Sequence, residues 1–289
     1  MKKEHSKTIV IVVGVALAAL LIGLIAAFIS IRSVGQQNAA IQSELTRAVS
    51  RISQQVQDIK EANEKQYSDK KFNEAVARAI NNYGQQKQEE IRQAKLQEYA
   101  NAPDTLIEGK RIYGNPQARF TLVEFSDIEC PYCKRFHPTP KELVDSSNGL
   151  VNWEWRHLPL EFHNPVAKIE AHAAECVGEL AGNKAFWAYI SDIFAHTAGN
   201  GQGANNLLNL AVDLGVDAQD FKKCMQSARH EEKIDKDIAM AASLSISGTP
   251  ATILTDNHTG NTQLLGGAQP KEAFITAMQN MQQAANEKD

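Results

Sequence analysis

Two cysteines separated by two residues, Cys130-Pro131-Tyr132-Cys133, are the positions in this chain whose spacing points most directly to chemistry. They follow a mostly apolar run, Arg119–Ser126, and precede a stretch that is compatible with a helix. A C-x-x-C pair at the junction of a strand and a helix is typical of a dithiol that is reversibly oxidised to a disulfide. The pattern therefore predicts thiol–disulfide exchange.

The two cysteines are expected to play different roles. If Cys130 opens the helix, the unpaired N–H groups of the first turn and the helix dipole stabilise its thiolate. Pro131 suits that first turn, because its missing N–H loses nothing there. Cys133 would lie about one turn further in and be more buried. We expect Cys130 to attack a disulfide and Cys133 to resolve the mixed disulfide.

Glu124 is an acid within an otherwise apolar segment, Leu122–Phe125. Strand alternation points its side chain away from the face of Val123 and Phe125, toward the active-site helix. A carboxyl group buried there would have a raised pKa and would exchange a proton with Cys133. The alternative is an exposed acid on a half-solvated strand.

A Gly-Thr-Pro sequence, residues 248–250, precedes a second strand-like run. Bonds before proline have only a small preference for trans, so a cis bond before Pro250 is compatible with the sequence. A cis bond would expose the backbone of Thr249 to an extended substrate segment. On the residues alone, the motif is a turn before a strand.

The remaining cysteines, Cys176 and Cys224, are isolated within predicted helices. Structural zinc usually takes four ligands, often from two C-x-x-C pairs, so we expect no metal and no cofactor. We expect instead a structural disulfide between Cys176 and Cys224, with two buried thiols as the alternative. Three histidines are expected to be surface or packing residues rather than catalytic ones: His137, His157 and His163.

The N-terminal segment, residues 1–32, contains an uncharged run over residues 8–31. About 20 apolar residues are enough to cross a bilayer as a helix. Lysines precede the run and only Arg32 closely follows it, which predicts a cytoplasmic N-terminus. We expect a single-pass anchor in a bacterial inner membrane, with a cleaved signal peptide as the alternative. Both place the catalytic domain in the periplasm.

Residues 33–102 are rich in Gln, Ala, Glu, Lys and Asn, and predict a helical stalk. Apolar residues in the first part of the stalk follow a nearly heptad spacing: Ile41, Leu45, Ala48, Ile52, Val56 and Ile59. A single helix with so narrow an apolar stripe is marginally stable. We therefore expect a coiled coil that joins copies of the chain into a homo-oligomer, with a break or kink at residues 81–84. The alternative is a solvated stalk that only lifts the domain off the membrane.

Residues 103–289 follow an α/β pattern. The expected strands cover residues 105–113, 119–126, 151–157, 251–254 and 262–265, and the last helix covers about 270–285. Between the third and fourth strands, residues 165–245 are expected to form only helices, joined by loops that include residues 201–203 and 214–217. This order predicts a small mixed sheet that carries a long helical insertion.

Five segments of the chain closely resemble the DsbA-like proteins of the thioredoxin fold. In chain order they are Leu122–Cys133, Arg156–Leu160, Ala173–Cys176, Ala185–Trp187 and Ser247–Pro250. The resemblance covers roughly residues 105–285, and does not extend to the predicted anchor or stalk.

The resemblance implies a thioredoxin fold with a helical insertion and no cofactor. It implies that Cys130 is the nucleophile and Cys133 its partner, that Pro250 is cis and faces them, and that Glu124 is the buried acid. The Cys176 and Cys224 positions match a second, non-catalytic disulfide of many relatives.

The direction of exchange stays open at this point. We expect a periplasmic enzyme that forms disulfides in exported proteins and is reset by a quinone-linked oxidase in the membrane. Tyr132, where the best-known oxidases have His, predicts a less acidic Cys130 and a less oxidising disulfide. Tyr132 and Thr249 also resemble isomerases and reductases of the DsbG kind, which an electron-importing membrane reductase would keep reduced.

A non-enzymatic scaffold or holdase is the remaining alternative. Against it, a disulfide across so short a loop would constrain little chain entropy. The formal net charge of −4 gives no indication of nucleic-acid binding.

Overall fold

The computed structural model describes residues 42–58, 60 and 69–287, and the chain divides into two compact units, residues 1–80 and 81–289. The predicted membrane anchor lies outside the described residues. Among the residues that are described, no helix is both long and apolar enough to cross a bilayer.

The described part of the expected stalk is helical. Residues 42–58 form one helix, and α2 (Asp69–Glu98) runs without interruption. The predicted break at residues 81–84 is therefore wrong. No proline interrupts this segment, and a single glycine, Gly84, costs a helix only about 1 kcal/mol.

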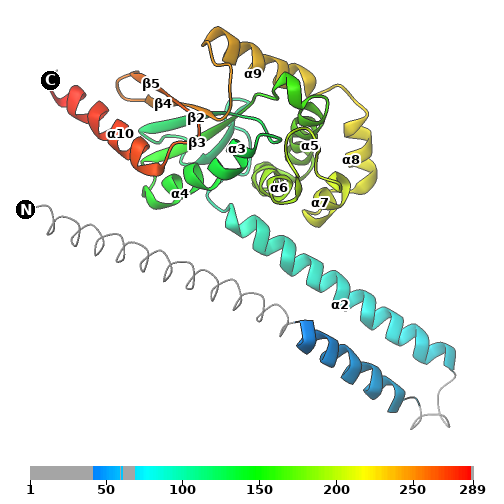
Figure 1. The fold of residues 1–289 in the computed structure, drawn as a ribbon. Coiled ribbons are helices and arrows are strands. Elements are labelled where there is room, and N and C mark those ends of the chain that lie inside the picture. The colour runs from blue at the N-terminus through cyan, green and yellow to red at the C-terminus, as the bar shows by residue number, and fades with distance from the viewer. Residues whose placement is uncertain (1–41, 59, 61–68, 288–289) are drawn as a thin grey trace, which may run out of the picture. The chain divides into compact units, whose positions relative to one another are not determined.

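A five-stranded mixed sheet forms the centre of the second unit (Figure 1). Its order is β1-β3-β2-β4-β5; β2 and β3 are parallel, and the other neighbouring pairs are antiparallel. The bounds are β1 (Arg111–Gly114), β2 (Phe120–Ser126), β3 (Val151–His157), β4 (Ala251–Asp256) and β5 (Thr262–Gly266).

Four of the five strands lie close to their predicted ranges, and the first is shorter than expected. Ile107 and Lys110 form an isolated bridge across a tight turn in which Gly109 has a φ of +77°. Pairing with β3 begins only at Arg111. The expected strand over residues 105–113 is thus split by a turn that the apolar pattern does not reveal.

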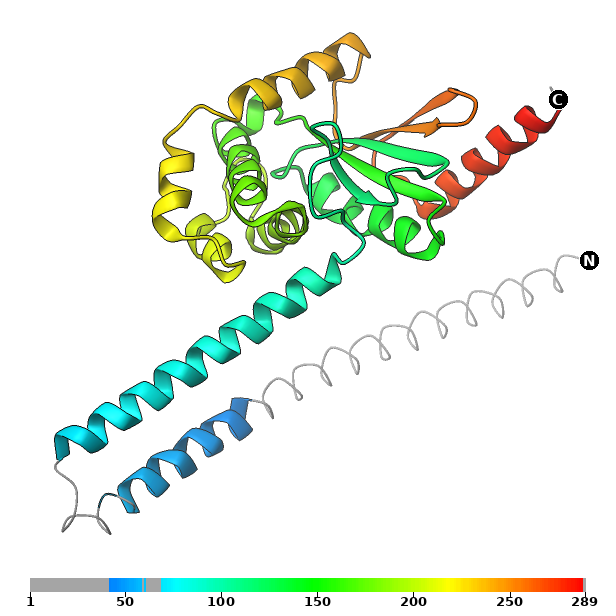
Figure 2. The same cartoon turned by 180° about the vertical axis from the view of Figure 1, so that it is seen from behind.

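Helices cover both faces of the sheet (Figures 1 and 2). Leu122 and Trp153 belong to the core shared with α4 (Pro138–Ser146) and α10 (Lys271–Asn286). Phe125, on the opposite face, packs with Ala241 of α9 (Glu231–Ser243). Because side chains of β2 alternate between the two faces, the face of Leu122 also carries Glu124.

The expected insertion between β3 and β4 is present and largely helical. It begins with a 3-10 turn (Glu161–His163) and contains α5 (Val166–Ala181), α6 (Asn183–His196), α7 (Leu207–Asp213), α8 (Ala218–Met225) and α9. The predicted loop at residues 201–203 lies between α6 and α7, where Gly201 and Gly203 have positive φ angles, and the predicted loop at residues 214–217 separates α7 from α8. Trp187 of α6 packs on Trp153 of β3, with ring centroids 4.4 Å apart.

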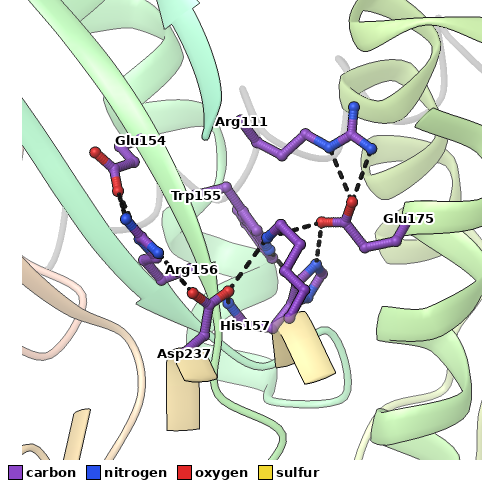
Figure 3. Close-up of polar contacts among 8 residues, drawn as sticks. Arg111, Glu154, Trp155, Arg156, His157, Glu175 and Asp237 are labelled. Atoms are coloured by element: carbon purple, nitrogen blue, oxygen red, sulfur yellow. Dashed lines mark hydrogen bonds and ion pairs between the residues drawn. The ribbon is translucent and has the colours of Figure 1, made fainter. Parts of the chain in front are cut away.

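A buried ion network ties the insertion to the sheet (Figure 3). Glu175 of α5 accepts from Arg111 of β1 at 2.7 Å and lies 3.2 Å from Nε2 of His157. Lys233 of α9 lies 3.0 Å from Glu175 and 3.3 Å from Asp237. These charges sit on different elements, so the network holds α5 and α9 in register with β1 and β3.

Candidate active site

Cys130 lies between β2 and α3 (Pro131–Phe136), as the N-cap residue of that helix. Its backbone is extended, with φ −80° and ψ 121°, and Pro131 takes the first helical position. The side chain is buried, and its Sγ lies 3.5 Å from the carbonyl oxygen of Thr249. Cys130 is therefore held between the start of a helix and the segment that precedes β4.

The pKa of Cys130 is lowered to about 5. The largest cause is a hydrogen bond from the Cys133 thiol, which opposes the effect of burial. Smaller contributions come from Thr249 and from the backbone N–H groups of Cys133 and Tyr132. Cys130 is thus a thiolate at neutral pH in the reduced form.

Cys133 is fully buried beneath Cys130, and the backbone N–H of Asp127 lies 3.5 Å from its Sγ. Burial raises the pKa of the Cys133 thiol, and the negative charges of Cys130 and Glu124 raise it further. The two cysteines therefore differ strongly in acidity, as expected for an attacking thiolate above a protonated thiol.

Glu124 is fully buried on the α3 side of the sheet, and burial raises its pKa to about 8. Ser126 and Trp153 moderate this rise, but neither forms a hydrogen bond of ordinary geometry with the carboxyl oxygens. The carboxyl group is therefore protonated at neutral pH and lies within electrostatic reach of Cys133. The alternative of an exposed acid on this strand is wrong.

Thr249 and Pro250 face the cysteine pair through a cis peptide bond. The antiparallel pairing of β2 with β4 places Ala251 beside Phe125, which brings the residues before β4 to the end of β2. The Thr249 carbonyl thereby reaches Cys130, although 119 residues separate the two in the chain. A second cis bond, Asn164–Pro165, was not indicated by the sequence.

Asp127 organises the loop between β2 and α3, a role that the sequence patterns did not predict. One carboxyl oxygen accepts from the Glu129 N–H at 2.8 Å; the other accepts from the Leu160 N–H at 2.9 Å and lies 2.7 Å from Nδ1 of His163. Its carbonyl accepts from the Cys130 N–H at 3.0 Å. The only signal in the sequence was the position of an acid three residues before the first cysteine.

Tyr132 is exposed, as is Pro131 before it, and 58% of the surface of Tyr132 is accessible. The guanidinium of Arg135 lies over its ring, 5.0 Å from the centroid. The site therefore presents an aromatic ring and a cation to an approaching polypeptide.

The three histidines are all buried. His137 packs among aromatic rings, with its centroid 4.9 Å from that of Phe194, and burial lowers its pKa to about 3. His157 belongs to the ion network, and His163 supports Asp127. His137 and His157 are packing residues, whereas His163 contributes to the architecture of the active site.

Cys176 of α5 and Cys224 of α8 form a disulfide, with the Cα atoms 5.9 Å apart. The two groups of potential metal ligands among the described residues both include a sulfur of this disulfide: His172 with Cys176 and Cys224, and Glu179 and His230 with Cys224. A disulfide sulfur is not the thiolate that zinc binds. The oxidised chain therefore offers no cysteine thiolate to a metal in either group.

The family model described as Thioredoxin matches residues 106–265, which is more than half of the chain. The crystal structure of Pseudomonas aeruginosa DsbA2 is similar, at 34% sequence identity and a TM-score of 0.55. That match covers 61% of this chain and 97% of the other. The shared part therefore spans nearly the whole of that protein.

Oxidised BdbD from Bacillus subtilis has the same fold, with 20% identity, a TM-score of 0.52, and coverage of 62% of this chain and 96% of that one. Among curated proteins, the Na(+)/H(+) antiporter NhaA 1 of Salinispora arenicola is 36% identical over 139 residues, or 48% of this chain. Those residues are only 20% of the antiporter, so this chain spans about a fifth of that relative's length.

The residues that the family model matches include the cysteine pair at the start of α3 and the cis proline that faces it. The chain belongs to the thioredoxin family, and the domain that carries Cys130 and Cys133 is a thiol:disulfide oxidoreductase domain of the DsbA type.

Proposed function

We propose that this protein forms disulfides in exported proteins, with Cys130 as nucleophile, Cys133 as its partner and Glu124 as proton donor and acceptor. The observation that carries the proposal is the difference in acidity between the two cysteines, with a pKa of about 5 at Cys130 and a raised pKa at Cys133. Thr249, before cis-Pro250, presents its carbonyl beside Cys130 and would pair with an extended substrate.

In the oxidative direction, a substrate thiolate attacks Sγ of Cys130 and breaks its bond to Cys133. Cys133 leaves as a thiolate and takes a proton from the carboxyl group of Glu124. A second substrate thiolate then attacks the substrate sulfur of the mixed disulfide, and Cys130 leaves as a thiolate. Two electrons pass from the substrate dithiol to the cysteine pair, and the stabilised Cys130 thiolate is a good leaving group.

Stabilisation of the Cys130 thiolate favours the reduced form and therefore makes the disulfide an oxidant. A pKa of about 5 lies between the values of roughly 3.5 for DsbA and 7 for thioredoxin. We infer an oxidase of intermediate strength, in keeping with Tyr132 at the position where stronger oxidases have His.

The equilibrium of the Cys130/Cys133 couple with glutathione tests this proposal, using a soluble chain that begins at residue 33. A potential between those of DsbA, about −120 mV, and thioredoxin, about −270 mV, is expected for this disulfide donor, and a value close to that of thioredoxin would contradict the proposal. A couple that is inert to glutathione would exclude an oxidoreductase and favour an anchored scaffold.

Single-cysteine variants separate the two roles. Cys133→Ser is expected to accumulate mixed disulfides with a reduced, unfolded test protein after activation with a disulfide reagent, because nothing resolves them. Cys130→Ser is expected to form none. Non-reducing electrophoresis distinguishes the two variants. Equal amounts of mixed disulfide in both would contradict the assignment of Cys130 as the nucleophile and Cys133 as the resolving cysteine.

Isomerisation is a second candidate, favoured by Thr249 before the cis proline and by the apolar residues exposed along the expected stalk. An isomerase starts from reduced Cys130, so it would reactivate a scrambled disulfide protein without an added oxidant. If the protein does not reactivate the scrambled protein but rapidly oxidises a reduced substrate, isomerisation is excluded and the oxidase function is supported.

We infer further that residues 8–31 anchor the enzyme in the inner membrane, with the catalytic domain in the periplasm. The support is the absence of charge in this run and the lysines before it. Its membrane redox partner would then be a quinone-linked oxidase, or an electron-importing reductase for an isomerase. Carbonate extraction of membranes, with protease protection of the C-terminal domain, tests the anchor and its orientation.

A further inference from the structure

A pair of buried carboxyl groups, Glu129 and Glu170, lies beside the active-site segment and holds the loop between α6 and α7. Glu129 directly precedes Cys130 in the chain. One of its carboxyl oxygens accepts from the Thr197 hydroxyl, and the other accepts from the Gly203 N–H at 2.9 Å. Its backbone carbonyl accepts from the Asn200 N–H at 2.7 Å.

Glu170 reaches the same loop from α5. Its Oε1 accepts from the Ala204 N–H at 2.8 Å, and Glu129 accepts from the neighbouring Gly203 N–H. Adjacent backbone amides thus bind the two carboxyl groups and bring them together. Both side chains are almost completely buried, at 0% exposure for Glu129 and 1% for Glu170.

Two carboxyl groups in one buried site do not both ionise, so the pair holds one proton. Burial, together with the charge of Glu129, raises the pKa of Glu170 to about 8. The pKa of Glu129 is lowered, because hydrogen bonds from Thr197 and Gly203 outweigh its burial. Glu170 therefore carries the proton, and among the described residues its Oε2 has no hydrogen bond of ordinary geometry.

The loop itself is built to be held in this position. Four of its residues have positive φ angles: Gly199 (+75°), Asn200 (+55°), Gly201 (+79°) and Gly203 (+77°). A Cβ atom at position 199 would lie 3.3 Å from the Glu129 carbonyl and 3.6 Å from Cγ of Pro131. The loop therefore rests directly on the start of the active-site helix.

A lysine of that helix adds a contact from the other side. Nζ of Lys134 donates to the carbonyl of Thr197 at 3.0 Å. The loop is therefore bonded to the chain both before Cys130, at Glu129, and after Pro131, at Lys134.

We propose that Glu129 and Glu170 are positioning residues, which share one proton and clamp the loop Thr197–Ala204 against the active-site segment so that Cys130 keeps its helix-capping conformation. The clamp keeps the backbone N–H groups of α3 directed at the Cys130 sulfur. It rests on the proposed function, since it acts on the reactivity of the same thiolate.

The direction in which the Cys130 pKa shifts in a Glu129 variant distinguishes the positioning role from a purely electrostatic effect of the Glu129 charge. Removing the charge of Glu129 without any structural consequence would make the Cys130 thiolate more favourable and lower its pKa. Loss of the clamp has the opposite effect, because the misaligned N–H groups no longer stabilise the thiolate. Gln at position 129 has one acceptor oxygen in place of two, so it cannot accept from both Thr197 and Gly203.

The experiment is a pH titration of thiolate absorbance at 240 nm in the reduced chain that begins at residue 33. Glu129→Gln is expected to raise the Cys130 pKa by about one unit. Glu170→Ala is expected to raise it too, whereas Glu170→Gln keeps the wild-type value because its amide replaces the carboxyl proton. Glu272→Gln, the same change at an exposed site on α10, is the control.

A lowered or unchanged Cys130 pKa in Glu129→Gln overturns the proposal, and so does equal behaviour of Glu170→Ala and Glu170→Gln. If Glu170→Ala does not fold, the pair Glu129→Gln and Glu170→Gln still decides the question. The wild-type glutathione equilibrium is measured in parallel. A wild-type pair that is inert to glutathione refutes the proposed function, whereas a redox-active wild type with unresponsive variants refutes only the clamp.

Amide hydrogen exchange in the loop gives an independent readout. Above about pH 8, loss of the shared proton leaves two carboxylates that repel each other and weaken the contacts of the loop. The amide exchange rate at residues 200, 203 and 204 is then expected to rise with pH more steeply than base catalysis alone predicts. Glu170→Gln removes this excess. The charged and titratable groups that face the pair from neighbouring elements are Asp127, His163, Lys134 and Tyr189. Excess exchange that persists in Glu170→Gln would assign the effect to one of these.

Discussion

Glu124 is a buried acid, and burial of its carboxyl group lowers the stability of the fold at pH values where the group would ionise. Its position near Cys133 gives this destabilising residue its proposed function in proton transfer. Among the described residues, neither a cation nor a hydrogen bond of ordinary geometry stabilises its carboxylate, and its pKa is raised to about 8 from an ordinary value of 4.5. A group whose pKa is raised by folding contributes stability below its unfolded pKa, and that contribution is lost as the pH rises toward its folded pKa. Glu124 therefore makes the protein less stable at pH 8 than at pH 4.

We predict that Glu124→Gln is more stable than the wild type at pH 7.5, by roughly 4 kcal/mol at most, and that the difference vanishes near pH 4. The amide is neutral at every pH, so it carries no ionisation cost. Denaturant unfolding of the oxidised form at the two pH values measures this, since Cys133 does not titrate there. An equal difference at both pH values would mean that Glu124 is not protonated in the folded state.

The same variant is expected to exchange disulfides more slowly. Proton transfer by a positioned side chain contributes about 10²–10⁴-fold in enzymes, and Gln cannot exchange a proton with Cys133. Stopped-flow oxidation of a reduced peptide measures the rate, and a variant that is more stable yet equally fast would refute the catalytic role.

Tyr132 is the residue of the C-x-x-C loop that we expect to tune the potential. Tyr132→His places a partly cationic ring beside the cysteine pair, which favours the Cys130 thiolate and makes the disulfide more oxidising. We predict a shift of about 30 mV, or tenfold in the glutathione equilibrium. Tyr132→Phe, which changes no charge, is the control and is expected to leave the potential unchanged.

At the scale of elements, α5 is the helix on which the supports of the site converge. It carries Glu170 for the loop beside Cys130, Glu175 for the ion network of Figure 3, and Cys176 for the disulfide to α8. Glycine at position 178 lets Arg111 cross this helix, because a Cβ atom there would lie 2.3 Å from its guanidinium.

We predict that Gly178→Ala destabilises the fold by about 1–3 kcal/mol, the usual cost of overpacking. Arg111 is buried and paired with Glu175, so its guanidinium cannot move away without breaking that pair. Gly84→Ala in α2 is the matched control: nothing lies within 4 Å of its Cβ position, and alanine favours the helix. Thermal unfolding compares the two, and equal melting temperatures would refute the steric argument.

At the scale of the whole molecule, apolar side chains stay exposed along the described helical segments before the thioredoxin domain. Leu45 is 64% exposed, Ile52 60% and Ile80 65%. Exposed apolar residues at regular helical spacing favour association between copies of the chain. Such association would place several active sites in one assembly.

We predict that the chain beginning at residue 33 is an oligomer at micromolar concentration and that the chain beginning at residue 81 is a monomer. Leu45→Lys combined with Ile52→Lys is expected to dissociate the longer chain, because charges at the seam lose the apolar contact. Sedimentation equilibrium measures the mass. Lys60→Leu, away from the predicted seam, is the control, and a longer chain that is monomeric without any change would refute the coiled coil.

The sequence by itself determined the redox pair, the order of strands and helices, and the position of the insertion. These follow from local patterns: a C-x-x-C at a strand end, alternation in Val151–His157, and Gly-Thr-Pro before a strand. Local patterns also placed Glu124 on the correct face, because side chains alternate along a strand.

Only the tertiary structure decided which distant groups meet at the site. The Thr249 carbonyl reaches Cys130 through strand pairing across 119 residues, and Glu129 reaches Thr197 and Gly203 across more than 60. The burial that raises the pKa of Glu170 to about 8, like the contacts that hold Asp127, comes from packing between elements. The residue types and their spacing do not predict such contacts. Almost every residue supplies a backbone N–H group, so the sequence does not indicate which loop amide a distant carboxyl group will bind.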